Sequence, residues 1–209
     1  MSHPLLPVLR RARVVPVIRT STAAHAITAC AWLREAGFTV LELTLTTPDA
    51  VAIIRELAGE PGLTVGAGTV PDAAAAEACL TAGARFLVTP WVDPEVIRLA
   101  RAAGAAAMPG AMTPTEIRAA LAAGADVVKI FPASSAGGPG HVKAVRAVFP
   151  QAVFCPTGGV DAGNAPAYLA AGAAFVGIGG KLVDEARIAA GDKPAIMRAA
   201  HEALGIEQA

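Results

Sequence analysis

AAGADVVKIFP, at residues 122–132, contains the end of a helix, a turn and a buried strand. The alanines that lead into Gly124 are typical of a helix whose last turn is closed by a glycine in the left-handed conformation. The apolar run at 127–130 predicts a strand that is buried on both faces, and Pro132 ends it. A helix followed directly by a buried strand is the repeating unit of α/β proteins.

The same unit recurs along the chain. Alanine–glycine pairs end at Gly37, Gly83, Gly104, Gly124 and Gly172, and an apolar run follows each of them. The middle three glycines are roughly 20 residues apart, and the two outer gaps are about twice as long. Each long gap therefore contains one more unit. The predicted strands cover residues 14–19, 40–45, 64–68, 86–89, 106–108, 127–130, 152–156 and 175–178.

Eight buried strands that alternate with helical patterns predict a parallel sheet closed into a single (β/α)8 TIM barrel. One such barrel accounts for residues 1–209, so a single domain is expected. Residues 5–12 predict an extra N-terminal helix, and residues 193–204 predict a terminal helix on the outside.

Composition excludes several classes of function. Lys plus Arg and Asp plus Glu both number 17, so no basic face for nucleic acid is indicated. No apolar run approaches the roughly 20 residues of a membrane span. The widely spaced Cys30, Cys79 and Cys155 predict reduced thiols in a cytoplasmic protein. The histidines are scattered along the sequence, so no metal site is expected. No GxGxxG motif follows a predicted strand, so no dinucleotide cofactor is expected.

Lys129 is the residue that points most strongly to chemistry. It lies inside a buried strand, where desolvation disfavours the charged ammonium group. A desolvated lysine amine is the nucleophile that forms Schiff bases with carbonyl substrates. The alternative is a structural lysine that reaches solvent from the strand end or pairs with a buried acid.

Glu42 is the expected companion of that lysine. It lies in the run LELTL at 41–45, whose alternation puts Glu42 and Thr44 on one face and the leucines on the other. The leucines suit contact with the outer helices, so Glu42 points into the barrel. It is either a general acid/base beside Lys129 or a structural ion-pair partner, and the two roles are compatible.

Substrate-binding residues are expected where strands end. Two glycine pairs, Gly158–Gly159 and Gly179–Gly180, follow the last two strands and predict a phosphate cradle. A single such pair is more often a tight turn. Lys181 could add charge there or be solvated. Thr69 is a candidate hydroxyl donor, and Arg19 is either a carboxylate clamp or a surface arginine.

These motifs together resemble those of the KHG/KDPG aldolases, whose substrate is 2-keto-3-deoxy-6-phosphogluconate. The matching stretches run in order from about residue 14 to residue 183. They are VPVIR at 15–19, LELT at 41–44, GAGTV at 66–70, MPG at 108–110, KIFP at 129–132, GP at 138–139, VKA at 142–144 and CPTGGV at 155–160.

The resemblance implies a class I aldolase that uses Lys129 for the Schiff base and Glu42 as general acid/base. It implies that Thr69, Pro90 and Thr157 line a phosphorylated 2-keto acid. It also implies a phosphate held at the two glycine pairs, cleavage of 4-hydroxy-2-oxoglutarate by many members, and a homotrimer.

Two positions depart from the family pattern. Thr46 stands where some members carry a carboxylate-binding arginine, and a serine often found near the second glycine pair is missing. Alternative functions remain open at this point. One is an aldolase for the galactonate epimer, and another is a phosphate-binding sugar epimerase or isomerase on a small barrel.

Overall fold

Helix ends follow the predicted alanine–glycine pattern. In the computed structural model, which describes residues 3–206, Gly37, Gly83, Gly104, Gly124 and Gly172 all have positive φ angles between 71° and 114°. This left-handed conformation ends a helix without a clash because glycine lacks a Cβ. The prediction of a helix end at each pair is confirmed.

The chain alternates strands with helices. The strands are β1 (Val14–Ile18), β2 (Val40–Thr44), β3 (Thr64–Gly68), β4 (Phe86–Val88), β5 (Ala106–Met108), β6 (Gly110–Ala111), β7 (Val128–Ile130), β8 (Phe154–Pro156) and β9 (Val176–Ile178). The helices are α1 (Leu6–Ala12), α2 (Ala23–Ala36), α3 (Ala50–Ala58), α4 (Ala73–Thr81), α5 (Pro94–Ala102), α6 (Pro114–Ala123), α7 (Gly138–Val148), α8 (Ala165–Ala170), α9 (Glu185–Ala189) and α10 (Lys193–Gly205).

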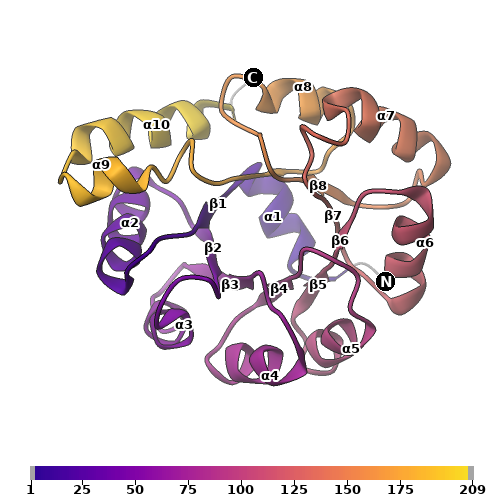
Figure 1. Ribbon diagram of the computed structural model, residues 1–209, viewed down its shortest axis with the longest axis horizontal. Coiled ribbons are helices and arrows are strands. Elements are labelled where there is room, and N and C mark those ends of the chain that lie inside the picture. The colour runs from indigo at the N-terminus through magenta and orange to yellow at the C-terminus, as the bar shows by residue number, and fades with distance from the viewer. Residues whose placement is uncertain (1–2, 207–209) are drawn as a thin grey trace.

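All strand pairs are parallel, and the sheet curls so that helices cover its outer side (Figure 1). The ladders form a six-stranded sheet, in the order β5-β4-β3-β2-β1-β9, and a three-stranded sheet, β6-β7-β8. The predicted fifth strand is confirmed as β5, and a short additional strand, β6, follows it after Pro109 and pairs in the other sheet. The fold is therefore α/β with a curled parallel sheet, as the alternation predicts.

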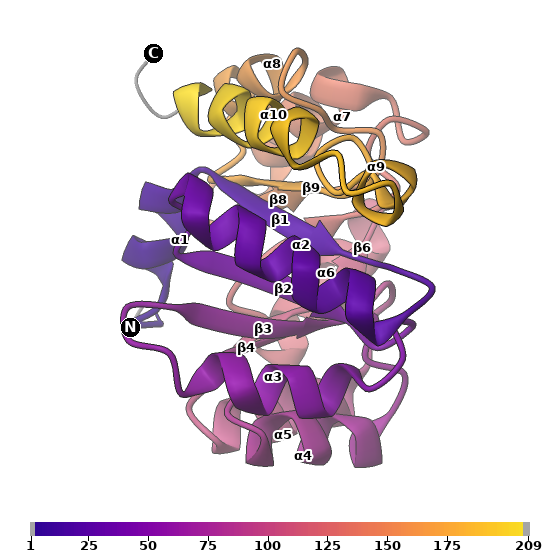
Figure 2. The same cartoon turned by 90° about the vertical axis from the view of Figure 1, so that its left-hand side faces the viewer.

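Strand side chains alternate between two apolar layers. Leu41 and Leu43 pack with helix residues in the outer layer. Val40 belongs to the inner layer, which also includes Leu6 and Leu9 of α1. The predicted N-terminal helix therefore packs on the inner layer, and Figure 1 shows it behind the centre of the curled sheet. Figure 2 shows α1 at the end where β1 begins, so the opposite end is available for a site.

The last part of the chain differs from the sequence-based expectation. Helix α9 was not predicted, and α10 packs against both α9 and α2. Figure 1 shows α9 and α10 side by side next to α2. Within residues 3–206, no helix combines the length and apolar character that crossing a membrane requires.

Candidate active site

Lys129 and Glu42 meet inside the curled sheet. Lys129 is the central residue of β7, Glu42 is the central residue of β2, and both side chains are buried. Lys129 Nζ lies 3.9 Å from Glu42 Oε1 and 4.9 Å from the centroid of the Phe131 ring. The ammonium form thus has one acidic neighbour and one aromatic face, which together offset part of its desolvation.

The Glu42 carboxyl group is incompletely paired. Its Oε1 atom has no hydrogen-bond partner among the described residues. Burial raises the pKa of Glu42 above its usual 4.5, although Lys129 and Arg19 act in the opposite direction. A Cβ at Gly68 would collide with Glu42 Oε1, so glycine at that position makes room for the carboxyl group. A buried carboxyl group that readily holds a proton is suited to general acid–base chemistry.

Arg19 follows the end of β1 and is held by hydroxyl groups. Its guanidinium group donates hydrogen bonds to Thr46 Oγ1 at 2.7 Å and to Thr69 Oγ1 at 3.0 Å. No carboxylate in residues 3–206 forms an ion pair with it. Its orientation is therefore fixed while its charge stays available to an anionic ligand.

A cavity of about 780 Å³ opens beside these groups. Among the predicted site residues, those that line it are Arg19, Lys129, Thr157, Gly158, Gly159, Gly179 and Gly180. Glu42 does not line it but contacts Lys129, and Thr69 reaches it only through Arg19. Pro90 lies outside the cavity lining and packs against Gly110.

The two glycine loops form one wall of the cavity. Gly158 and Gly159 have φ angles of 90° and 75°, and a Cβ at Gly159 would collide with Ser134. Thr157 pairs with Gly177 of β9, which brings the loops after β8 and β9 side by side. Within residues 3–206, the backbone N–H groups of Gly159, Gly180 and Lys181 donate no hydrogen bond to a backbone carbonyl group. Such free N–H groups are suited to an anion.

The cavity also includes residues that the sequence did not indicate. Asp184 and Arg187 come from the start of the α9 region, and Arg198 and Glu202 come from α10. The one available signal was their spacing, because Arg198 and Glu202 are four residues apart and share a helix face. The predicted terminal helix on the outside is present as α10, and one face of it also lines the cavity, which the sequence did not indicate.

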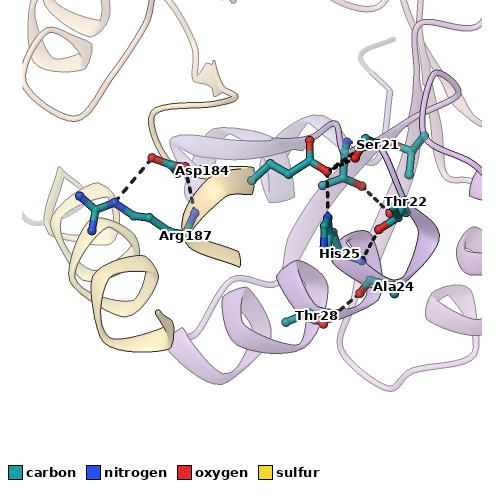
Figure 3. A network of polar contacts seen from close by, with 10 residues as sticks. Ser21, Thr22, Ala24, His25, Thr28, Asp184 and Arg187 are labelled. Atoms are coloured by element: carbon teal, nitrogen blue, oxygen red, sulfur yellow. Dashed lines mark hydrogen bonds and ion pairs between the residues drawn. The ribbon is translucent and has the colours of Figure 1, made fainter. Parts of the chain in front are cut away.

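A polar network fixes this side of the cavity (Figure 3). Glu185 Oε1 accepts hydrogen bonds from Ser21 N, Ser21 Oγ and His25 Nδ1, at 2.6, 2.7 and 2.9 Å. These bonds, that from His25 first, lower the pKa of Glu185 to about 2. Figure 3 also shows Asp184 beside Arg187. Arg187 Nε lies 3.6 Å from Asp184 Oδ2. The loop that follows Arg19 is thereby tied to α9.

The titration of Glu42 tests the electrostatics of the site. Because burial favours the neutral acid, the Glu42 carboxyl should lose its proton above pH 4.5, whereas Glu185 should do so near pH 2. Carboxyl ¹³C NMR of glutamate-labelled protein would measure both midpoints, and loss of a resonance in Glu42→Gln would assign it. A Glu42 midpoint at or below 4.5 would contradict the proposed desolvation.

Comparison with known proteins gives a consistent result. The family model described as KDPG and KHG aldolase matches residues 6–199. A 2-dehydro-3-deoxy-phosphogluconate aldolase of Pseudomonas aeruginosa is 38% identical over 93% of this chain and 89% of its own length. A probable 2-dehydro-3-deoxy-6-phosphogalactonate aldolase of Rhizobium meliloti is 42% identical over 72% of each chain.

A solved structure agrees with these matches. The KDPG aldolase of Legionella pneumophila, with pyruvate captured as a covalent carbinolamine intermediate, superposes with a TM-score of 0.84. It is 32% identical and covers 94% of this chain and 96% of its own. Family model, sequence relatives and fold all agree, and the chain belongs to the KDPG and KHG aldolase family.

Proposed function

We propose that this protein is a class I aldolase that cleaves 2-keto-3-deoxy-6-phosphogluconate to pyruvate and glyceraldehyde 3-phosphate. The same chemistry would cleave 4-hydroxy-2-oxoglutarate to pyruvate and glyoxylate. The observation that carries the proposal is the pairing of buried Lys129 with the proton-holding carboxyl group of Glu42 beside a cavity suited to anions. Membership of the aldolase family supports it.

The reaction begins at Lys129. Its neutral amine attacks the C2 carbonyl carbon of the substrate, and loss of water from the resulting carbinolamine leaves an iminium ion. The positive iminium withdraws electrons from the adjacent C3–C4 bond, and so serves as the electron sink for cleavage. The ring of Phe131, whose centroid lies 4.9 Å from Lys129 Nζ, covers one side of the amine.

Glu42 supplies the proton transfers. As carboxylate it accepts the proton of the C4 hydroxyl group, directly or through a water molecule, while the C3–C4 electrons move into the iminium. The aldehyde product leaves, and an enamine remains on Lys129. Return of the proton to C3 and hydrolysis of the imine release pyruvate and restore both side chains. The raised pKa of Glu42 suits a group that must both take and return a proton.

Two positively polarised regions orient the substrate. Arg19, positioned by Thr46 and Thr69, binds the carboxylate end. The glycine loops at Gly158–Gly159 and Gly179–Gly180 receive the phosphate through backbone N–H groups. In this proposal Thr157 lines the substrate between them, whereas Pro90, after the end of β4, supports the site from behind through its contact with Gly110.

We also propose that the curled sheet is a complete (β/α)8 barrel formed by one domain, residues 1–209, which extends beyond the described residues at both ends. The bridge between Thr157 and Gly177 connects the two sheets on one side. On the other side, Ala107 O accepts hydrogen bonds from Asp126 N at 2.9 Å and from Val127 N at 3.2 Å. Both seams between the sheets thus carry backbone contacts.

A second candidate substrate is the galactonate epimer, which differs at C4 only. It is favoured by the 42% identity to the probable 2-dehydro-3-deoxy-6-phosphogalactonate aldolase. Both epimers would use the same lysine and the same carboxyl group. The ratio of kcat/KM for the two epimers decides between them, and an epimerase or isomerase would release pyruvate from neither.

We further propose that the protein is a cytoplasmic homotrimer. The exposed Trp91 and Met112 follow β4 and β6, where Pro90 packs against Gly110, and large exposed apolar side chains on adjoining loops suit a subunit contact.

The three cysteines are consistent with the proposed cytoplasmic location. Burial raises the pKa values of Cys30, Cys79 and Cys155 to about 12, 11 and 12, which keeps these thiols unreactive.

The assigned activity depends on one amine. Lys129→Met should reduce pyruvate release from 2-keto-3-deoxy-6-phosphogluconate to background, because the nucleophile is lost while an apolar chain fills its space. Exposed Lys143 on α7 provides the control, and Lys143→Met should keep normal turnover. Pyruvate release would be followed in a coupled assay with lactate dehydrogenase. Substantial turnover by the Lys129 variant would refute the proposed mechanism.

The role of Glu42 predicts a loss in kcat. Glu42→Gln keeps the shape of the side chain but cannot take up a proton, so kcat should fall by about 10²- to 10⁴-fold. Measurement of kcat across pH, together with thermal unfolding, separates catalysis from a structural role. Near-normal kcat at the optimal pH, accompanied by a large loss of stability, would identify Glu42 as a structural partner of Lys129 only.

Oligomeric state is directly measurable. Size-exclusion chromatography with light scattering should give the mass of three chains over the micromolar concentration range. Trp91→Ser should shift the protein towards single chains because it removes an apolar contact from the interface, whereas Ile27→Ser, at a residue 50% exposed on α2, should not. A wild-type mass of one chain at all concentrations would rule out the trimer.

A further inference from the structure

The cavity wall concentrates positive charge in a chain whose charges balance. Its basic side chains are Arg19, Lys129, Lys181, Arg187 and Arg198. Its acidic side chains are Asp184 and Glu202 only, so basic side chains outnumber acidic ones in the cavity wall. Over the whole chain the two kinds are equal in number, because Lys plus Arg and Asp plus Glu both number 17. An excess of one sign in a cleft with low-dielectric walls raises the local concentration of ligands of the opposite sign.

Not all of these cations are available to a ligand. Arg187 Nη1 lies 3.0 Å from Asp192 Oδ2, and its Nε lies 3.6 Å from Asp184 Oδ2. Lys129 faces Glu42. Lys181 and Arg198, by contrast, form no ion pair with any carboxylate of residues 3–206.

Both of these cations line the same cavity as the glycine loops. Lys181 directly follows Gly180, so its backbone N–H and its side chain belong to the same turn. Arg198 lies on the face of α10 formed by Ala195, Arg198 and Ala199, which all line the cavity. The small alanines let α10 approach the cavity, and the long arginine side chain extends from that face.

We propose that Lys181 and Arg198 form a cationic clamp over the glycine loops and set the preference of the proposed aldolase for substrates that end in a phosphate. This inference rests on the proposed function. A phosphate monoester carries nearly two negative charges, whereas backbone N–H groups offer only partial positive charge. The two side chains supply the charge that the loops lack, and arginine adds planar, two-point hydrogen bonding to the phosphate oxygens.

A binding measurement tests the clamp without turnover. Glycerol 3-phosphate, titrated calorimetrically at low ionic strength, should bind Arg198→Gln and Lys181→Gln roughly three- to tenfold more weakly than wild type. The double variant should lose at least about tenfold, and the losses should shrink with added salt. Arg118→Gln is the matched control, since Arg118 is an exposed helical arginine of α6 that lies outside the cavity and forms no ion pair within residues 3–206.

A kinetic measurement tests specificity. The ratio of kcat/KM for 2-keto-3-deoxy-6-phosphogluconate to that for 4-hydroxy-2-oxoglutarate should fall in each clamp variant by a factor similar to the loss of affinity. The change should lie mainly in KM for the phosphorylated substrate, because the phosphate is remote from the bonds that change. Arg118→Gln should leave the ratio at the wild-type value.

The two proposals fail in different ways. If wild type cleaves neither substrate but the clamp variants lose affinity for glycerol 3-phosphate, the aldolase assignment fails and the anion clamp stands. If wild type is active and the double variant keeps its affinity and its substrate ratio within twofold of wild type, the clamp is overturned and the aldolase stands. A loss of affinity with an unchanged ratio overturns the role in specificity.

Discussion

The desolvation of Lys129 and Glu42 is the constraint on which the rest of the site depends. Lys129 Nζ lies 3.9 Å from Glu42 Oε1 inside the curled sheet, and burial raises the pKa of the Glu42 carboxyl group. Removal of either partner leaves the other buried without compensation, which is costly. That cost is consistent with function, because a lysine and a carboxyl group buried side by side supply the nucleophile and the proton carrier that Schiff-base chemistry requires.

The two ends of the curled sheet serve different purposes. Helix α1 fills one end with apolar side chains, and the cavity occupies the other, next to α9 and α10. Glu185 connects the loop after β1 to α9, so the proposed carboxylate-binding and phosphate-binding regions are held relative to each other. If the carboxylate-binding and phosphate-binding regions each hold one anionic end of the substrate, the substrate carbonyl is fixed beside Lys129. An efficient reaction requires such positioning.

Much of the fold could be predicted because its signals are local. The alanine–glycine pairs mark helix ends through a conformation that glycine adopts readily, and the alternation around Glu42 places it opposite the leucines. The additional strand β6 after Pro109 depends on pairing with β7, which a single segment does not reveal. Pro90 follows a strand end as expected, yet it packs on Gly110 rather than lining the cavity.

The contribution of α9 and α10 could not be predicted, because it depends on packing between distant segments. Glu185 contacts Ser21 across 164 positions of sequence, and Arg198 reaches the cavity only because α10 packs against α2 and α9. A helical pattern indicates which residues share a face but not which surface that face meets. The glycine pairs indicated a phosphate cradle with Lys181 as a possible charge beside it, whereas Arg198 became evident only from the cavity.

Covalent trapping is the most direct test that Lys129 is the Schiff-base nucleophile. The protein would be reduced with borohydride in the presence of pyruvate, digested, and mapped by mass spectrometry. A reduced pyruvate adduct on the peptide that contains Lys129, dependent on pyruvate and missing from Lys129→Met, is the result predicted here. An adduct on Lys143 or Lys181 instead, or full activity without any adduct, would contradict the account.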